Sequence, residues 1–135
     1  MYHHVLIPVS FEADRNTMRA IEIGKALAGA EGRITLLHVQ ESVPGYVAGY
    51  LPTNFKEEAR AELMAQLSMM TDGLKNAEVL VVEGHAGRTI SDWAAHHDVG
   101  CIVVASHRPG VQNILIGSTA TNVVRHAPCA VHVIR

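Results

Sequence analysis

The chain has 135 residues, of which 48% are hydrophobic and 18% charged, a balance typical of a folded globular protein. A formal net charge of −2 excludes the broad basic surface that nucleic-acid-binding and membrane-surface proteins use, so neither partner is expected. No apolar run approaches the length of a membrane span, and the first residues lack a signal-peptide pattern, which favours a cytoplasmic location.

The length fits a single domain over residues 1–135. Cys101 and Cys129 have no CxxC spacing, so we expect reduced thiols that serve in packing. The predicted elements, in chain order, are a strand at residues 5–9, a helix at about 14–30, a strand at 33–39, a helix at 55–74, a strand at 77–82, a helix around 90–94, a strand at 100–105, a helix at 120–127 and a strand at 130–134.

The five predicted strands are rich in Val and Ile, and their apolar residues are nearly continuous rather than alternating. Such runs indicate strands that are buried on both faces. Because strands and helices alternate along the chain, we predict an α/β fold with an open, doubly wound parallel sheet and helices on both of its faces.

One connection, residues 40–54, is long for a compact domain. It contains turn-forming residues and two tyrosines: Pro44, Gly45, Gly49, Pro52, Tyr46 and Tyr50. A mobile flap over a site or a partner surface is one interpretation. A surface excursion with no such role is the alternative.

The polar residues that follow two of the strands predict a binding site. In an open doubly wound sheet, ligands bind at the carboxyl ends of the strands, where the winding direction reverses. An order such as 3-2-1-4-5 places the first and fourth strands side by side at that point. Their carboxyl ends carry Pro8, Val9 and Ser10, and Ala105, Ser106, His107 and Arg108. A Gly117-Ser118 step then opens the next helix, whose N-terminal N–H groups favour an anion, most often a phosphate.

Several common motifs are absent from the sequence. The only Gly-Lys step lies in a helical pattern without a Walker loop, and neither GxGxxG nor GxSxG occurs. The nine histidines show no metal-ligand spacing, so no metal site is expected. Gly84-His85-Ala86-Gly87 either brings the backbone close to a ligand or forms a plain turn into a helix. No catalytic residue is predicted.

Segments along nearly the whole chain resemble the universal stress protein family: VLIPVS, GRITLLHV, VVEGHAGRTI and CIVVASHRPGVQNILIGSTATNVVRHAPCAVHVIR. The last segment is the most specific, and it is similar to the F/G-type single-domain members, which bind ATP. Ala105 and Arg108 stand where the wider ATP-binding pattern has glycines, and the interval from Arg108 to Gly117 is one residue shorter. The resemblance implies an adenine nucleotide alpha hydrolase-like fold, strand order 3-2-1-4-5, and a nucleotide across the ends of strands one and four.

The phosphate half of this expected site combines backbone and side-chain donors. Gly117 lets the backbone turn tightly, and the N–H groups of Ser118 and Thr119 donate to phosphate oxygens. The Ser118 hydroxyl either adds a donor or simply caps the helix. The Arg108 guanidinium suits a phosphate, with a surface ion pair as the alternative, and His107 either contacts the phosphate or faces water.

The base half rests more fully on the resemblance. Pro8 and Ser10 border the adenine, and Val39 resembles the position where the second strand meets the base through its backbone. The family usually has Asp where this chain has Ser10, so the preference among ATP, ADP and AMP stays open. The residues expected to bind the nucleotide are Pro8, Val9, Ser10, Val39, Ala105, Ser106, His107, Arg108, Gly117, Ser118 and Thr119.

The resemblance further implies a homodimer in which the last strand, residues 130–135, pairs with its copy across a two-fold axis. A monomer with a protected edge is the alternative. We expect a stress-response or signalling protein that binds ATP or another adenine nucleotide, with or without magnesium, and hydrolyses it slowly at most. A nucleotide-free dimeric interaction module is the second hypothesis. An adenylating enzyme is the weakest, because SFEADRN replaces the glycine-serine-rich turn after strand one.

Overall fold

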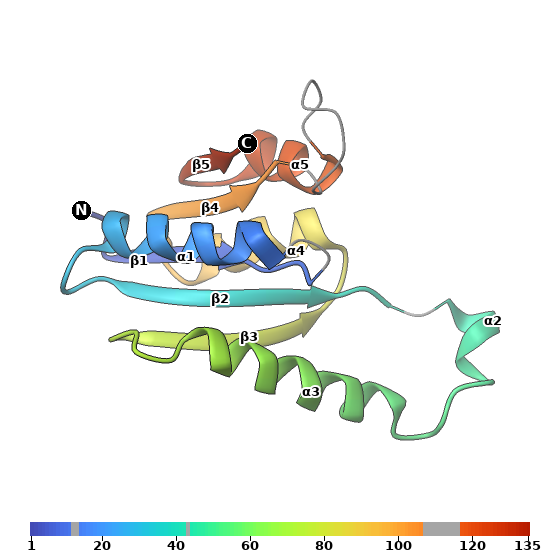
Figure 1. The fold of residues 1–135 in the computed structure, drawn as a ribbon. Coiled ribbons are helices and arrows are strands. Elements are labelled where there is room, and N and C mark those ends of the chain that lie inside the picture. Colours follow the sequence, from blue (N-terminus) through green and yellow to red (C-terminus); the bar gives the residue numbers. More distant parts are fainter. Residues whose placement is uncertain (12–13, 43, 107–116) are drawn as a thin grey trace.

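The alternation of strands and helices is present in the computed structural model, which describes residues 1–11, 14–42, 44–106 and 117–135 (Figure 1). The elements are β1 (His4–Pro8), α1 (Asp14–Ala28), β2 (Arg33–Gln40), α2 (Gly45–Ala48), α3 (Phe55–Met70), β3 (Ala77–Glu83), α4 (Ala86–His96), β4 (Cys101–Ala105), α5 (Ser118–His126) and β5 (Ala130–Ile134). All five predicted strands and all four predicted helices are confirmed within a few residues, and α2 is an additional short helix.

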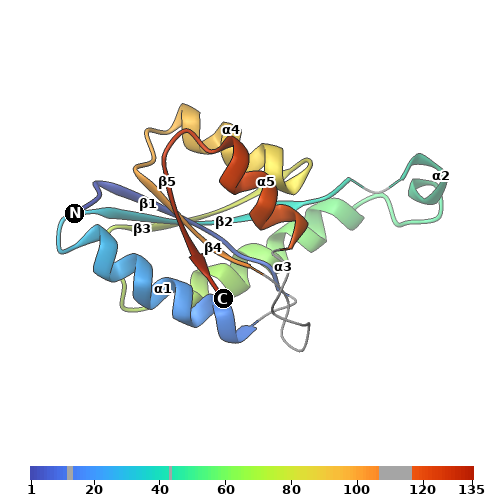
Figure 2. The ribbon, with the colours of Figure 1, turned by 90° about the horizontal axis from the view of Figure 1, so that it is seen from above.

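The strands form one parallel sheet in the order β3-β2-β1-β4-β5, which confirms the predicted order. Strand β1 lies between β2 and β4, with His4 beside Arg33 and Val5 beside Cys101. The winding direction therefore reverses at β1 and β4. Helices α1 and α3 cover one face of the sheet, and α4 and α5 cover the other (Figure 2).

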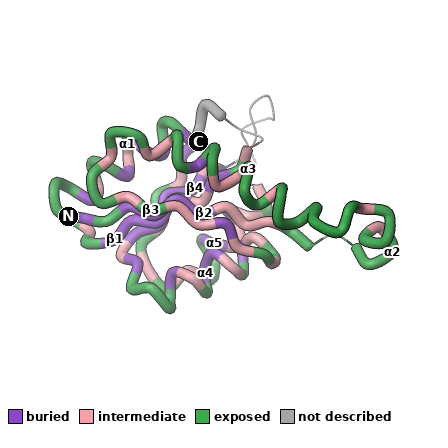
Figure 3. Tube along the Cα trace, turned by 90° about the horizontal axis from the view of Figure 1, so that it is seen from below, coloured by how far each residue is buried: buried purple, intermediate pink, exposed green. Residues whose placement is uncertain are grey.

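Burial on both faces explains the continuous apolar runs. In β1, Val5 and Ile7 pack in the cluster that contains α1 and α3 residues, whereas Leu6 packs in the cluster that contains α4 and α5 residues. All three side chains are fully buried, and the central strands form the buried centre of the molecule (Figure 3). Cys101 is buried in β4 and Cys129 is half-buried, and both are free thiols.

A chain of polar side chains crosses the amino end of this apolar sheet. Thr35 donates its hydroxyl hydrogen to Glu78 Oε1 (3.0 Å), so His4 Nε2–H must donate to Thr35 Oγ1 (2.8 Å). Nδ1 of the neutral ring then accepts from Arg33 Nη2 at 3.1 Å. The same Nδ1 also lies 3.0 Å from the carbonyl oxygen of His97. A hydrogen bond to that oxygen needs a proton on Nδ1 as well as on Nε2, and so forms only in the charged ring. Burial is the main effect that lowers the pKa of His4, which favours the neutral ring.

The buried His4 predicts a pH-dependent stability. Its pKa is lowered from about 6.5 on folding, so between that value and the lowered pKa the unfolded chain binds a proton that the folded chain does not. The free energy of unfolding should therefore be maintained above about pH 6.5 and fall, by up to about 1.4 kcal/mol per pH unit, on acidification below it. Urea unfolding of wild type and His4→Gln between pH 7.5 and 5 measures this. An equally steep loss in both proteins would contradict the assignment, since the other histidines are common to them.

Residues 44–54, here called the arm, contain α2 and precede α3. The arm extends away from the sheet rather than over the carboxyl ends of the strands, with Tyr46 81% and Tyr50 90% exposed (Figures 1 and 2). At its base, Ser42 Oγ and Lys56 Nζ both donate to Glu83 Oε1, at 3.1 and 3.2 Å. These two donors lower the pKa of the Glu83 carboxyl. In this conformation the arm does not cover the strand ends.

Within the described residues, no helix has both the length and the apolar character needed to cross a membrane.

Candidate functional site

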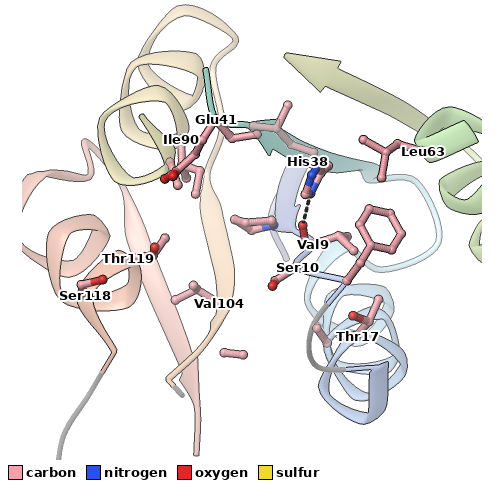
Figure 4. Close-up of a pocket in the computed structure, with 17 residues that line it drawn as sticks. Val9, Ser10, Thr17, His38, Glu41, Leu63, Ile90, Val104, Ser118 and Thr119 are labelled. Carbon is pink, nitrogen blue, oxygen red and sulfur yellow. Dashed lines mark hydrogen bonds between the residues drawn. The ribbon is translucent and has the colours of Figure 1, made fainter. Parts of the chain in front are cut away.

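A cavity of about 640 Å³ opens at the carboxyl ends of β1, β2 and β4, where the sequence predicts a ligand (Figure 4). Its size falls in the usual range of small-molecule sites. Seven of the residues predicted to bind a nucleotide line it: Pro8, Val9, Ser10, Val39, Ala105, Ser118 and Thr119. The strand ends and the start of α5, far apart in the sequence, thus surround one space.

Two further predicted residues lie beside the cavity rather than in its lining. Ser106 is buried, and its N–H donates to the carbonyl of Ile134 at 2.8 Å. The carbonyl of Ser106 accepts from the N–H of Gly117, which connects the end of β4 to the start of α5. Both residues support the cavity through their backbones. His107 and Arg108 lie outside the described residues.

The start of α5 corrects two sequence-based expectations. Gly117 is the N-cap residue, with φ −60° and ψ 159°, a conformation that any residue adopts, so the backbone there does not require glycine. Ser118 is the first helical residue, so its hydroxyl is not the N-cap. Among the residues that the structure describes, no side-chain hydrogen bond caps this end of the helix. The first N–H groups of α5 begin beside the cavity.

Further residues that line the cavity were not predicted from the sequence: Phe11, Thr17, Ala20, Leu37, His38, Glu41, Leu63, Ala86, Ile90 and Val104. His38 and Glu41 were within reach of the same reasoning, because they lie beside Val39 at the carboxyl end of β2. His38 Nδ1–H donates to the Val9 carbonyl at 2.8 Å, and its ring makes an edge contact with Phe11 at 4.9 Å. His107 is therefore not the only candidate histidine at this site.

Ala86 is the one residue of the Gly84 to Gly87 turn that lines the cavity, and neither glycine does. Gly84 has φ +153°, a conformation that favours glycine, and an added Cβ would meet Thr89 Oγ1 at 2.5 Å. A Cβ at Gly87 would lie 2.6 Å from Asn122 Cγ on α5. The second glycine therefore permits close packing of α4 on α5, and the plain-turn interpretation fits better than direct approach to a ligand.

The described part of the lining carries little charge. Glu41 is its single acidic side chain and His38 its single histidine, and no Lys or Arg belongs to the described lining. In Figure 4 the Glu41 carboxylate extends toward the side of the view where Ser118 and Thr119 are found. Positive potential in the described lining therefore comes mainly from helix N-termini, those of α5 and α4, whose first residues Ser118 and Ala86 line the cavity.

The chain resembles known proteins over its whole length. A model of the Universal stress protein family matches residues 1–135. The chain belongs to this family. Relatives include Universal stress protein G of Salmonella typhimurium, 26% identical over the full length of both chains. Universal stress protein A homolog 2 of Coxiella burnetii is 30% identical, with 100% of this chain and 97% of the relative covered.

Solved structures of universal stress proteins share the fold. The protein UspA from Lactobacillus plantarum is 24% identical with a TM-score of 0.76, covering 99% of this chain and 98% of the other. A universal stress protein from Archaeoglobus fulgidus in complex with dAMP has 20% identity and a TM-score of 0.70, with 99% and 98% covered. Another, in complex with cAMP, has 19% identity and a TM-score of 0.67, with 99% and 97% covered. At these identities the likeness shows the shared α/β fold.

Proposed function

We propose that this universal stress protein binds ATP or another adenine nucleotide in the cavity at the ends of β1, β2 and β4. The observation that carries the proposal is the cavity itself, which opens at the point where the winding direction of the sheet reverses. The complexes of related folds with dAMP and cAMP support an adenine nucleotide as the ligand class.

The two sides of the cavity suit the two ends of such a ligand. The N–H groups of Ser118 and Thr119, at the start of α5, would donate to a phosphate. At the other side Pro8, Val9 and Ser10 would border the base, and the backbone of Val39 would meet its edge. Ala105 would lie along the cavity between them. Ser106 and Gly117 would support the phosphate side through their backbones, and Arg108 and His107 would add side-chain donors.

We propose binding rather than efficient turnover. Among the described residues no group of three or more His, Cys, Asp or Glu side chains is placed to hold a metal ion. A magnesium ion would arrive with the nucleotide, and its charge would offset Glu41 near the phosphate side. Hydrolysis, if measured, should be slow and incidental.

Calorimetric titration with ATP, ADP and AMP, each with and without magnesium, tests the proposal. When the free nucleotide concentration is one hundred times the Kd, binding should raise the free energy of unfolding by about 2.7 kcal/mol. A parallel thermal melt would detect this change. The order of affinities shows which phosphate chain length the site prefers. Absence of binding at millimolar nucleotide would contradict the proposal and favour the nucleotide-free interaction module.

We also propose a stress-response or signalling homodimer that pairs through β5 and the following residue, 130–135. Strand β5 pairs with β4 along one edge and is at the end of the sheet, and Ala130 and His132 on it are exposed. A second copy of β5 would satisfy the outer row of backbone groups. Sedimentation at micromolar concentrations should therefore show a dimer, and a species of single-chain mass alone would reject this arrangement.

A further inference from the structure

The backbone of β2 projects toward β1 at every second residue. The N–H of Arg33 donates to the carbonyl of His3 (2.9 Å), and the carbonyl of Leu37 accepts from the N–H of Val9 (2.8 Å). Because this direction repeats every two residues, the N–H and C=O of Val39 also point toward the β1 side. Strand β1 has ended there at Pro8, and the cavity begins.

If the parallel ladder continued by one more step, the carbonyl of Val9 would accept from the N–H of Val39. That carbonyl accepts instead from the His38 side chain, whose Nδ1–H donates to it at 2.8 Å (Figure 4). Within the residues that the structure describes, no hydrogen bond engages the N–H or the C=O of Val39. The His38 side chain therefore bonds to the Val9 carbonyl in place of the Val39 N–H.

The orientation of the His38 ring is fixed from two sides. Its Nδ1 must carry the hydrogen, because the Val9 carbonyl can only accept. The ring of Phe11, which also lines the cavity, lies against it edge-on, with centroids 4.9 Å apart and an interplanar angle of 66°. The ring and the end of β1 thus hold one another in place.

We infer that His38 is a positioning residue that keeps the peptide edge of Val39 open for the ligand base. The inference rests on the proposed nucleotide site. It adds a reason why the backbone edge of Val39 is available to the base. A free N–H beside a free C=O matches a planar heterocycle that carries an acceptor next to a donor, as adenine does. Without the His38 donor, the Val9 carbonyl would accept from Val39, the ladder would extend, and this edge would close.

Two substitutions separate the donor from the bulk of the ring. His38→Leu removes the Nδ1–H but keeps a side chain of similar size. His38→Asn keeps an N–H at a similar position. The exchange rate of the Val39 amide, measured residue by residue by NMR without ligand, reports the state of the edge. Titration with AMP and ATP reports binding. His96→Ala, an exposed histidine on α4, is the control for loss of a histidine.

In His38→Leu the Val39 amide should exchange about ten-fold more slowly than in wild type, because it gains the Val9 carbonyl, and nucleotide affinity should fall about ten-fold. Simple destabilisation would speed exchange instead, so the direction is diagnostic. His38→Asn and His96→Ala should resemble wild type.

An already protected Val39 amide in wild type would overturn the inference, as would an unchanged or faster rate in His38→Leu. The same holds if His38→Asn loses as much affinity as His38→Leu. If His38→Leu fails to fold, the Val39 exchange rates of wild type and His38→Asn still test the inference, because both amides should be unprotected. If wild type binds no nucleotide, the proposed function fails, whereas the exchange rates judge His38 separately.

Discussion

Ser118→Asp is expected to abolish nucleotide binding in a protein that is at least as stable as wild type. Ser118 is exposed at the first position of α5 and lines the cavity. A carboxylate there favours the positive end of the helix and should add about 0.3–1 kcal/mol of stability. A phosphate about 5 Å away would meet a like charge worth about 3 kcal/mol at an effective dielectric of about 20. Calorimetry should therefore show at least a hundred-fold loss of affinity.

Ser118→Asn is the matched control, since its side chain has nearly the shape of Asp without the charge. It should lose only a few-fold in affinity. Equal loss in the two variants would assign the effect to shape, and unchanged binding in Ser118→Asp would move the phosphate away from α5. A thermal melt of both variants excludes unfolding as the cause.

Thr35→Val is expected to lower the free energy of unfolding by about 2 kcal/mol, although the two side chains have the same shape. Thr35 is fully buried and His4 is 1% exposed, so water cannot replace the lost hydroxyl. The His4 Nε2–H would remain buried without an acceptor, and such an orphaned group costs about 1–3 kcal/mol. Urea unfolding at pH 7.5 measures the change.

Thr35→Ser keeps the hydroxyl and removes a methyl group, so it isolates the polar contribution. It should cost less than Thr35→Val, about 1 kcal/mol. A larger loss in the serine variant would show that apolar packing, rather than the His4 to Glu78 chain, dominates at this position. Nucleotide affinity should be the same in both variants, since Thr35 lies at the opposite end of β2 from the cavity.

The fold could be predicted because strands that are buried on both faces need nearly continuous apolar segments, which are easily recognised in the sequence. The runs that contain Val5 and Ile102 are nearly unbroken apolar segments, and the structure places both residues in the core. The apolar periodicity predicted the helix boundaries less accurately. The stripe that continues to Leu74 predicted a longer helix than α3, which ends at Met70 and is followed by Gly73 at φ +81°. The turn chemistry of that glycine outweighed the apolar spacing.

The candidate site could be located from strand ends but not completed. Residues such as Ser10 and Ala105 follow directly from the topology, because they come at the ends of neighbouring strands. Thr17, Leu63 and Ile90 come from helices, and their approach to the cavity depends on packing angles that periodicity does not encode. The importance of His38 depends on the bond from its ring to Val9, a contact between side chain and backbone.

The polar chain at the other end of the sheet was also beyond prediction. A histidine at the start of a strand, such as His4, is an ordinary polar neighbour of an apolar run in the sequence. Only the register of three strands, with His4 beside Arg33 and Thr35 beside Glu78, brings these groups together. One residue of slippage in either pair would separate them.

The arm provides a place where a chemical label can be attached without touching the sheet. Residues on either side of it both donate to the carboxylate of Glu83, so changes between them need not move β2 or α3. Burial raises the pKa of Cys101 and Cys129, which keeps both thiols weakly reactive at neutral pH. A cysteine introduced at the 90% exposed Tyr50 would therefore take a fluorophore selectively. Since the arm extends away from the sheet and none of its residues lines the cavity, the dye would leave the proposed ligand site free.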